Sequence, residues 1–351
     1  MAISNDQWIR AGQMLKKWHR PLLVAHARPD GDSLGSLIAM RRFCRSWGAD
    51  ATAILSDAPP ARYETWIRTE PFTRWPATQA ADAADGIVVL DTCTWTQLEP
   101  IAEFLRASAL PRIVVDHHKT RETLVGADQE ATVPQAYLID ETASAAALLV
   151  HEWARAMGWL DNADIETADA LFIGMATDTG WFRFSNTDAR TLSAAAELLD
   201  RGVQPDRWYT AIYDRSTPAR VRLKAAMLAT LDMDADDRLA SAILTQDAFA
   251  QAGATQADTE DLVQELQELA DVVASTLLIE QPDGQIRLNL RSKAPYVCGH
   301  DVDVAAIART FGGGGHARAA GARMPGPIAE ARSRVLAALR AALAAAGPTH
   351  T

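Results

Sequence analysis

Cysteine is scarce in this chain of 351 residues: only three are present, and no two of them form a CxxC pair. This scarcity excludes a disulfide framework and a cysteine-based zinc site, and it favours a reducing, cytoplasmic location. The sequence also lacks a basic N-terminal segment followed by an apolar run, and it lacks an uninterrupted apolar stretch of about 18 residues. We therefore expect neither a secretory signal nor a membrane partner.

Basic residues are also in deficit, because 45 acidic residues face 34 basic ones and the formal net charge is −11. A general binder of duplex nucleic acid is normally basic, so duplex DNA is not an expected partner. Net charge does not describe a pocket, and a local basic groove for a short anionic substrate stays compatible with this composition. The length and the 48% hydrophobic content indicate two globular domains.

The first half of the chain predicts an α/β fold. Short apolar runs at residues 21–25, 51–55, 86–90, 112–115 and 135–139 alternate with helical patterns at 33–47, 142–157, 165–176 and 188–200. This alternation is typical of βαβ units, so we expect a mostly parallel sheet flanked by helices. Asp32 or Ser33 is the expected N-cap of the helix at 33–47.

The second half has a different pattern and predicts a smaller α/β domain. We expect strands at residues 239–244, 273–280 and 285–291, and helices at 259–270, 302–310 and 328–346. Residues 281–284 separate the last two strands and end in glycine, which predicts a β-hairpin. The expected domains are residues 1–202 and 223–347, joined by a linker at 203–222.

Ionisable side chains gather where the predicted elements of the first half end. They form four clusters: His26 with Asp30 and Asp32; Asp91; Asp116 with His117 and His118; and Asp178. Each cluster taken alone is compatible with a helix cap or a solvated turn. Three of them follow apolar runs of one predicted sheet, where the carboxyl ends of neighbouring parallel strands form a common edge. We therefore expect the clusters to converge there.

Five carboxylates and three imidazoles are enough ligands for two divalent cations. We expect Gly31 to relax the backbone so that Asp30 and Asp32 point at different ions. Two ions about 3.5–4 Å apart, bridged by one carboxylate, are a common device for hydrolysing phosphate esters. Mixed carboxylate and imidazole ligands without cysteine favour Mn²⁺ or Mg²⁺, and the histidines favour Mn²⁺.

A glycine-rich segment marks the second half, where Gly312–Gly315 is followed by His316 and Arg318. Consecutive glycines allow backbone N–H groups to approach an anion closely, and the two charged side chains can contact a phosphate. The segment lacks the GK[ST] ending of a Walker A loop and the spacing of a dinucleotide-binding GxGxxG motif. Arg291, with Ser292 and Lys293, forms a second basic patch at the end of the predicted hairpin.

Together these motifs resemble the DHH phosphoesterases, which carry a histidine and two aspartates in the pattern of His26-x-x-Pro29-Asp30-x-Asp32, then Asp91, Asp116-His117-His118 and Asp178-Thr179-Gly180. The glycine run ending at His316 resembles the DHHA1 substrate-binding domain. The order and spacing agree over about residues 15–325. The compact two-domain form, without room for transmembrane, sensory or additional nuclease domains, is similar to the NrnA type of oligoribonuclease and 3′-phosphoadenosine-5′-phosphate (pAp) phosphatase.

The resemblance implies two Mn²⁺ ions, for which Mg²⁺ or Co²⁺ can substitute, in a cleft between the two domains. It implies one ion held by His26, Asp30 and Asp91, and the other held by Asp32, Asp91, His117 and Asp178. Asp116 would orient the histidine pair, and His118 would face the scissile phosphate. The implied substrate-binding residues of the second domain are Arg291, Gly314, Gly315, His316 and Arg318.

The activity implied is hydrolysis of RNAs of about two to five nucleotides to nucleoside monophosphates by a two-metal site, with or without conversion of pAp to AMP. A soluble phosphodiesterase for linear or cyclic dinucleotides, such as pApA or cyclic di-AMP, needs the same residues and stays open. A catalytically silent nucleotide sensor is the alternative of another class, and the complete ligand set argues against it. The resemblance also makes a homodimer an expectation that the composition does not decide.

Overall fold

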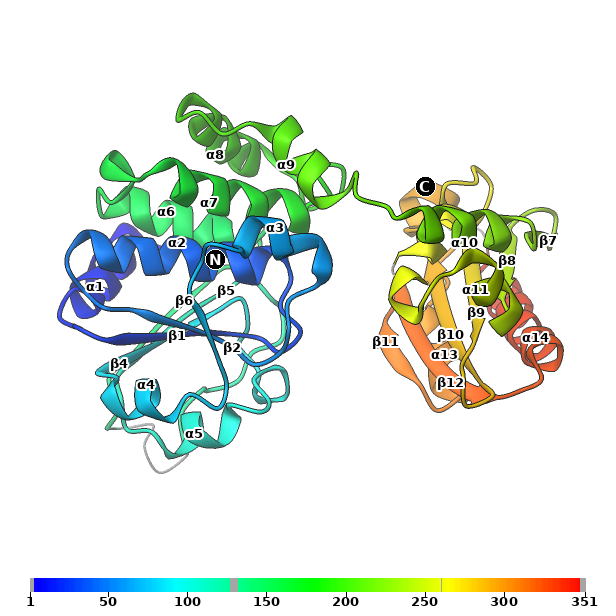
Figure 1. The fold of residues 1–351 in the computed structure, drawn as a ribbon, viewed down its shortest axis with the longest axis horizontal. Helices are drawn as coiled ribbons and strands as arrows, with labels where there is room; N and C mark the ends of the chain where they lie inside the picture. Colours follow the sequence, from blue (N-terminus) through cyan, green and yellow to red (C-terminus); the bar gives the residue numbers. More distant parts are fainter. Residues whose placement is uncertain (1–2, 127–131, 260, 348–351) are drawn as a thin grey trace. The chain divides into compact units, whose positions relative to one another are not determined.

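The computed structural model describes residues 3–126, 132–259 and 261–347. The chain divides into two compact units, Met1–Arg215 and Ser216–Thr351 (Figure 1). The division falls within the expected linker at 203–222, which is helical over much of its length: α9 (Pro205–Ile212) and the start of α10 (Pro218–Leu228) lie there. Both helices open with proline, whose missing N–H costs nothing at a first helical position.

The first unit is built on a six-stranded parallel sheet in the order β3-β2-β1-β4-β5-β6. The strands are β1 (Pro21–Ala25), β2 (Thr52–Leu55), β3 (Phe72–Arg74), β4 (Gly86–Leu90), β5 (Arg112–Asp116) and β6 (Gln135–Ile139). The expected parallel sheet is confirmed. Only β3 was not predicted, because three residues at a sheet edge, two of them exposed, give no apolar run.

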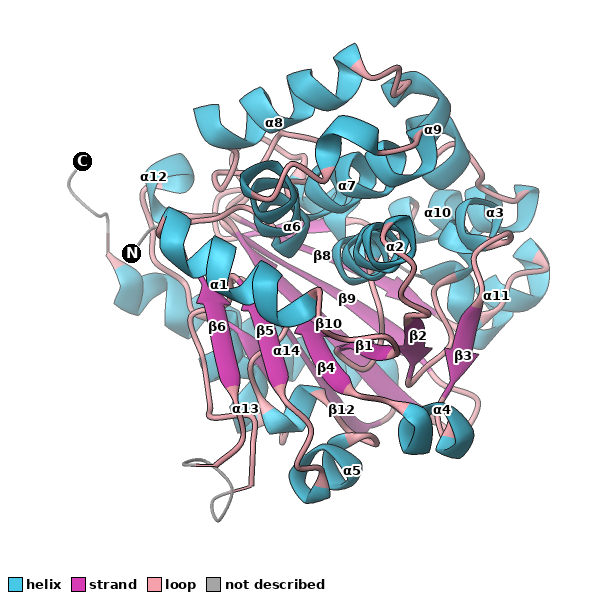
Figure 2. Ribbon diagram, turned by 90° about the vertical axis from the view of Figure 1, so that its left-hand side faces the viewer, coloured by secondary structure: helices cyan, strands magenta, loops and turns pink. Residues whose placement is uncertain are grey.

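Helices cover both faces of this sheet (Figure 2). One face carries α1 (Asn5–Leu15), α2 (Gly31–Ser46), α6 (Ala146–Ala156) and α7 (Ile165–Asp178), with α8 (Ala189–Asp200) packed outside them. The other face carries α4 (Thr78–Ala83) and α5 (Ala102–Ala107); α3 (Glu64–Ile67) and three short 3₁₀ turns complete the unit. Neighbouring residues of one strand enter different cores: Leu23 packs beneath α2, and Leu22 and Val24 pack toward α5. This alternation explains the continuous apolar runs in the central strands, such as Ile113–Val115 in β5.

The second unit has a mixed six-stranded sheet in the order β11-β12-β10-β9-β8-β7, in which only β8 and β9 are parallel. Its strands are β7 (Asp232–Asp234), β8 (Leu239–Leu244), β9 (Ala274–Glu280), β10 (Gln285–Ser292), β11 (Gly314–His316) and β12 (Ala319–Pro325). Its helices are α10, α11 (Gln246–Ala252), α12 (Pro295–Cys298), α13 (Val304–Thr310) and α14 (Ile328–Ala346). One apolar cluster joins the sheet to α13 and α14, and another joins it to α10 and α11.

The expected helix at 259–270 is wrong. The chain instead forms two 3₁₀ segments, Gln256–Thr259 and Leu262–Gln267. Asp261 has a φ of 59°, which an α-helix does not accommodate. The second 3₁₀ segment still buries Leu262, Val263 and Leu266. Apolar residues at helix-like spacing can therefore reach the core without forming an α-helix.

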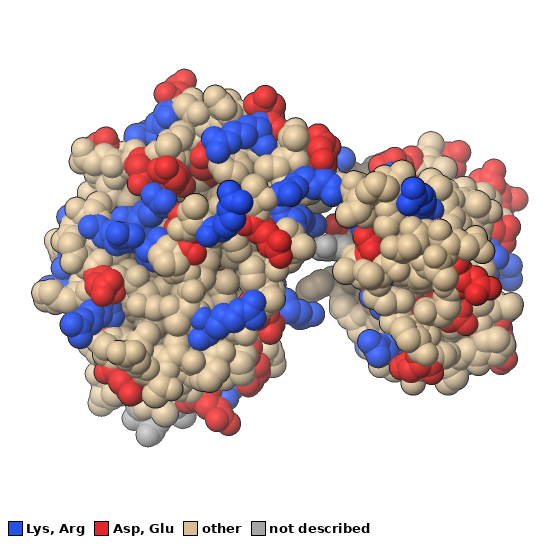
Figure 3. Space-filling view, in the orientation of Figure 1, with Lys and Arg blue, Asp and Glu red and all other residues tan. Residues whose placement is uncertain are grey.

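No helix within the described ranges is both long and apolar enough to cross a membrane. Acidic and basic side chains are interspersed over the face of the first unit that Figure 3 presents.

Candidate functional site

Three of the four ionisable clusters meet at one edge of the parallel sheet, as expected from the sequence. β4 lies between β1 and β5, and all three strands run in the same direction. His26 follows β1, Asp91 follows β4, and His117 follows β5 directly. The carboxyl ends of adjacent parallel strands therefore deliver an imidazole, a carboxylate and a second imidazole to the same place.

The loop after β1 differs from expectation at its helix cap. Asp30, and neither Asp32 nor Ser33, is the N-cap of α2: its Oδ1 accepts a hydrogen bond of 3.0 Å from the Ser33 backbone N–H, and Ser33 Oγ accepts one from Asp30. Asp32 consequently lies in the first turn, only 1% exposed. Its two carboxylate oxygens accept hydrogen bonds from the backbone N–H groups of Ala146, at 2.6 Å, and Ala147, at 2.8 Å.

Gly31 is required for space and not for backbone freedom. Its φ is an ordinary negative value, whereas a Cβ at this position would stand 2.3 Å from the Thr177 side-chain oxygen. Gly174 is similarly tight, because a Cβ there would meet the Ala147 Cβ at 2.5 Å. Gly31 lets α2 approach α7 closely, and Gly174 lets α6 approach α7, which brings Asp178, the last residue of α7, beside the strand ends. The expectation that Gly31 separates the aspartates by relaxing the chain is therefore wrong.

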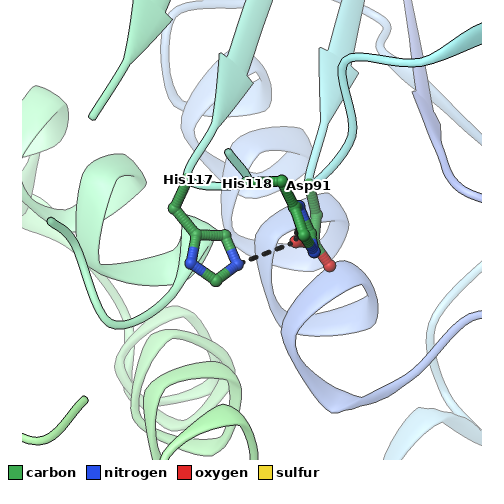
Figure 4. A group of neighbouring side chains, drawn as sticks. All are labelled: Asp91, His117 and His118. Atoms are coloured by element: carbon green, nitrogen blue, oxygen red, sulfur yellow. Dashed lines mark ion pairs between the residues drawn. The ribbon is translucent and has the colours of Figure 1, made fainter. Parts of the chain in front are cut away.

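The eight predicted side chains of the first unit form one connected cluster. His26 Nε2 lies 3.2 Å from Asp91 Oδ2 and 3.7 Å from Asp30 Oδ1. His117 Nε2 lies 3.4 Å from Asp91 Oδ1, and 3.7 Å from one carboxylate oxygen of each of Asp32 and Asp178. Figure 4 shows His117 and His118 reaching Asp91 from the end of β5. Asp91 thus touches both groups of ligands.

Asp91 is the centre of the cluster and is 2% exposed. Its φ of 60° is rare for a residue other than glycine, and such backbone is frequently found at functional sites. Burial alone would raise the pKa of Asp91, but hydrogen bonding with His117 and His26 lowers the pKa below its ordinary value. Its buried Oδ1 atom accepts no hydrogen bond of good geometry, and the nearest imidazole nitrogens are His117 Nε2 at 3.4 Å and His118 Nδ1 at 3.9 Å. A buried carboxylate oxygen without a well-placed donor is costly and fits a cation partner.

The carboxylates of the cluster raise the pKa of its histidines. Burial alone would lower the pKa of His26, but hydrogen bonds with Asp30 and Asp91 raise it to about 11. Burial opposes the charge of His117 too, and Asp91 and Asp32 raise its pKa to about 10. Burial raises the pKa of Asp178 to about 6. The carboxylates thus draw cationic partners to themselves, as a metal site would.

Three groups of side chains have the spacing that a metal ion needs. Their members are His26 with Asp30 and Asp91; Asp32 with His117 and Asp178; and Asp91 with His117 and His118, with one donor atom of each residue lying within 4.8 Å of the others. The donors are carboxylate oxygens and imidazole nitrogens, a set typical of borderline and hard divalent cations. The residues present therefore fit a metal centre.

Asp116 and His118 form a pair at the rim of the cluster. Asp116 is completely buried, and its Oδ1 lies 2.7 Å from His118 Nδ1 while also accepting from the His117 backbone N–H at 2.9 Å. The His118 side chain is 41% exposed, and the bond to Asp116 is the largest influence raising its pKa. A buried carboxylate thus fixes the orientation of an exposed imidazole.

The sequence reasoning missed the groups that hold Asp32 and Asp178. The N-terminus of α6 supplies the two N–H donors to Asp32, and Asn186 donates from its side-chain amide to the backbone oxygens of Ser144, at 3.1 Å, and Asp178, at 3.2 Å. Backbone donors leave no residue-type signature. Asn186 lies eight residues beyond Asp178, where nothing in the sequence pattern distinguishes it from an ordinary turn residue.

The candidate residues of the second unit lie on β10 and β11, except for Arg318, which lies in the turn between β11 and β12. Arg291 is directly opposite Ala319, and Ala319 is directly opposite His316, so Arg291 and His316 share one face of the sheet. His316 and Gly314 are exposed. Gly315 has a φ of 139°, and a Cβ there would stand 2.6 Å from the Ala319 carbonyl oxygen, so this position requires glycine.

Arg318 is engaged within its own unit. Its guanidinium forms an ion pair with Asp301 and donates to the Val302 carbonyl oxygen at 2.9 Å. These contacts hold the segment that leads into α13. The assignment of Arg318 to the substrate stays a prediction, as does that of Arg291, Gly314, Gly315 and His316.

Comparison with known proteins agrees with this architecture. Residues 21–175 match the DHH family, N-terminal domain, and residues 238–345 match the DHHA1 domain. A bifunctional oligoribonuclease and PAP phosphatase NrnA from Thermus thermophilus is 29% identical over 339 residues, covering 95% of this chain and 94% of the relative. The cyclic-di-AMP phosphodiesterase PdeA of Listeria monocytogenes is 24% identical over 94% of this chain, which spans 48% of that protein.

A solved structure has the same fold over almost the whole chain. It is an exopolyphosphatase-related protein from Bacteroides fragilis, with a TM-score of 0.85 and 23% identity, covering 98% of this chain and 97% of the other.

Proposed function

Because the chain belongs to the DHH phosphoesterase family and carries a DHHA1 domain, we propose that it hydrolyses short RNA oligonucleotides to nucleoside monophosphates and also converts pAp to AMP. The chain is a hydrolase of a metal-dependent family. The observation that carries the proposal is the convergence of seven carboxylate and imidazole side chains around Asp91 in one connected cluster. The NrnA relative, which this chain matches over nearly its whole length, supports the substrate assignment.

The proposed cofactor is a pair of Mn²⁺ ions. His26, Asp30 and Asp91 would hold one, and Asp32, Asp91, His117 and Asp178 would hold the other, with Asp91 common to both. The buried Oδ1 of Asp91, which accepts no hydrogen bond of good geometry, supports this arrangement. When bound, such ions neutralise charge on the phosphoryl oxygens and lower the pKa of water for in-line attack.

The chain's own residues complete the site in this proposal. His118 would face the scissile phosphate, because its imidazole is exposed while Asp116 fixes one ring nitrogen. With Nδ1–H held by Asp116, Nε2 is the ring atom that can meet the substrate. Arg291 and His316, on one face of the second unit's sheet, would bind the nucleotide or its other phosphate, together with the exposed backbone of Gly314 and Gly315.

A second candidate activity is hydrolysis of linear or cyclic dinucleotides. The observation in its favour is the similarity to PdeA, which extends over 94% of this chain. Both activities would use the same ligands, so they differ only in what the nucleotide-binding residues accept.

The experiment that tests the proposal is product release by purified full-length protein with Mn²⁺. Its substrates are 5′-labelled RNAs from dinucleotide to 24-mer, together with pAp and cyclic di-AMP, with Asp91→Ala as the control. Preferential cleavage of the shortest RNAs by the wild type alone is the expected result. Hydrolysis of cyclic di-AMP without RNA cleavage would transfer the proposal to the second candidate.

A further inference from the structure

Two arginines face each other across the sheet of the second unit. Arg287 on β10 is directly opposite Arg323 on β12, in the same antiparallel register that aligns Arg291 with Ala319. Side chains directly opposite in this way lie about 5 Å apart at Cβ, and like charges there are destabilising. The pairing of these two positive charges therefore does not stabilise the fold.

No carboxylate in the described part of the chain forms an ion pair with either guanidinium. Arg287 is half-buried and donates from one terminal nitrogen to the Thr259 hydroxyl, while its Nε is buried without a hydrogen-bond acceptor. Burial, and then the Arg323 guanidinium, lower the pKa of Arg287. Arg323 is exposed. The pair thus retains donor capacity and positive charge that an oxyanion would satisfy.

The pair lies on the same face as the candidate substrate residues. Residues 287, 289 and 291 alternate with the buried Ile286, Leu288 and Leu290, so Arg287, Asn289 and Arg291 point to one side of β10. Asn289 is opposite Gly321, which is opposite Gly314, so no side chain rises between the two basic positions on the outer strands. Four residues of extended strand separate Arg287 from Arg291 by about 13 Å.

We propose that Arg287 and Arg323 form a second phosphate site, which binds a phosphodiester group of an RNA whose terminal nucleotide occupies Arg291 and His316. This inference rests on the proposed function and adds a substrate-length preference to it. A dinucleotide is too short to place a phosphate at both sites, whereas a longer oligonucleotide can extend along Asn289, Gly321 and Gly314 from one site to the other. Arg291 and His316 therefore act on every substrate, and Arg287 and Arg323 act only on longer ones.

The test compares an RNA pentanucleotide with an RNA dinucleotide in the full-length, Mn²⁺-loaded protein. In the Arg287→Gln/Arg323→Gln double variant, we expect the ratio of kcat/KM for the pentanucleotide to that for the dinucleotide to fall about tenfold, as for one lost charged hydrogen-bonding site. An unchanged ratio would overturn the proposal. Arg334→Gln is the matched control, because Arg334 is an exposed arginine on α14 beside Phe311 and should leave the ratio unchanged.

Salt dependence separates a phosphate contact from a structural effect. Binding of the labelled pentanucleotide is measured by fluorescence anisotropy on full-length protein with metal chelated, so that hydrolysis does not interfere. Loss of one single-strand phosphate contact should reduce the slope of log affinity against log salt by about 0.7 in the double variant. A slope equal to that of Arg334→Gln would refute the site.

The same measurements distinguish failure of this inference from failure of the proposed function. If the wild type cleaves no RNA but the double variant still loses salt-dependent pentanucleotide binding, the proposed reaction fails and the phosphate site stands. If the wild type cleaves short RNA and the length ratio is insensitive to both arginines, the reaction stands and the phosphate site fails. The thermal midpoint of the double variant should match or exceed that of the wild type, because removing the two facing positive charges relieves their repulsion.

Discussion

Asp32 accepts a hydrogen bond of 2.6 Å from the backbone N–H of Ala146, and this bond joins the first turn of α2 to the first turn of α6. A neighbouring bond from Ala147 completes the contact. The N-terminal end of a helix favours a negative charge, so α6 reduces the cost of burying this carboxylate. The candidate metal ligands are therefore part of the packing of the first unit as well as of its chemistry.

Metal binding should stabilise the fold for the same reason. An ion that binds the folded chain alone adds about 2.7 kcal/mol to the free energy of unfolding at a concentration of 100 times its Kd. We expect Mn²⁺ to raise the urea midpoint of the wild type and to slow hydrogen exchange at the first amides of α6. Asp91→Ala should lose most of this response, and an equal response in that variant would contradict the assignment of Asp91.

Replacing Asp91 by asparagine should abolish hydrolysis while preserving side-chain shape. Mutating a residue that only supports a metal ligand typically lowers metal affinity or activity about 10–100-fold. Loss of a ligand shared by two ions should therefore lower kcat by more than about 100-fold. Asp161→Asn is the matched control, because Asp161 is exposed in a short 3₁₀ turn. Steady-state kinetics with an RNA dinucleotide checks both variants, and a loss below tenfold in Asp91→Asn would count against the two-metal arrangement.

Asp116→Asn tests the orientation of His118. The amide oxygen can still accept from the imidazole, but it lacks the charge that raises the pKa of His118. We expect kcat to fall about 10–100-fold with KM changed little, because the variant alters a positioning contact and not substrate binding. A rise in KM at constant kcat would instead place Asp116 in substrate binding.

Gly31→Ala should destabilise the protein by about 1–3 kcal/mol, because the added Cβ would stand 2.3 Å from the Thr177 oxygen and would force α2 away from α7. The same displacement moves Asp30 and Asp32, so Mn²⁺ affinity should fall with stability. Gly314→Ala provides the stability control, since a Cβ there meets nothing within 4 Å. Equal urea midpoints for the two variants would refute the steric explanation.

Glu70 predicts a pH dependence of stability. Burial alone would raise the pKa of Glu70, but hydrogen bonds from Arg42 and Arg41 lower it. A carboxyl whose pKa is lowered on folding contributes stability above its ordinary pKa, and that contribution is lost as the pH falls toward the folded-state value.

We therefore expect Glu70→Gln to cost about 3 kcal/mol at pH 7, since it leaves the buried Arg41 unpaired, and to cost less below about pH 4. Urea unfolding at both pH values measures the difference. Glu166→Gln is the control, because Glu166 lies 3.6 Å from Arg42 but is 57% exposed. A cost of Glu70→Gln that does not change with pH would contradict this reading.

The strand-end clusters could be predicted because each follows a short apolar run that ends abruptly at an ionisable residue. The cap of α2 could not be predicted, because Asp30, Asp32 and Ser33 are all good N-cap residues and lie within four positions. A tertiary contact decides between them, because the Asp32 carboxylate accepts hydrogen bonds from backbone N–H groups 114 and 115 residues away. The space requirement at Gly31 has the same origin, since Thr177 approaches from another helix.

The central claim is that Asp91 is shared by two metal ions, and crystals soaked in Mn²⁺ test it most directly. Anomalous diffraction at the manganese edge should show two peaks per chain: one contacting His26 and Asp30, the other contacting Asp32, His117 and Asp178, and both contacting Asp91. A single peak, or peaks that do not contact Asp91, would contradict the account.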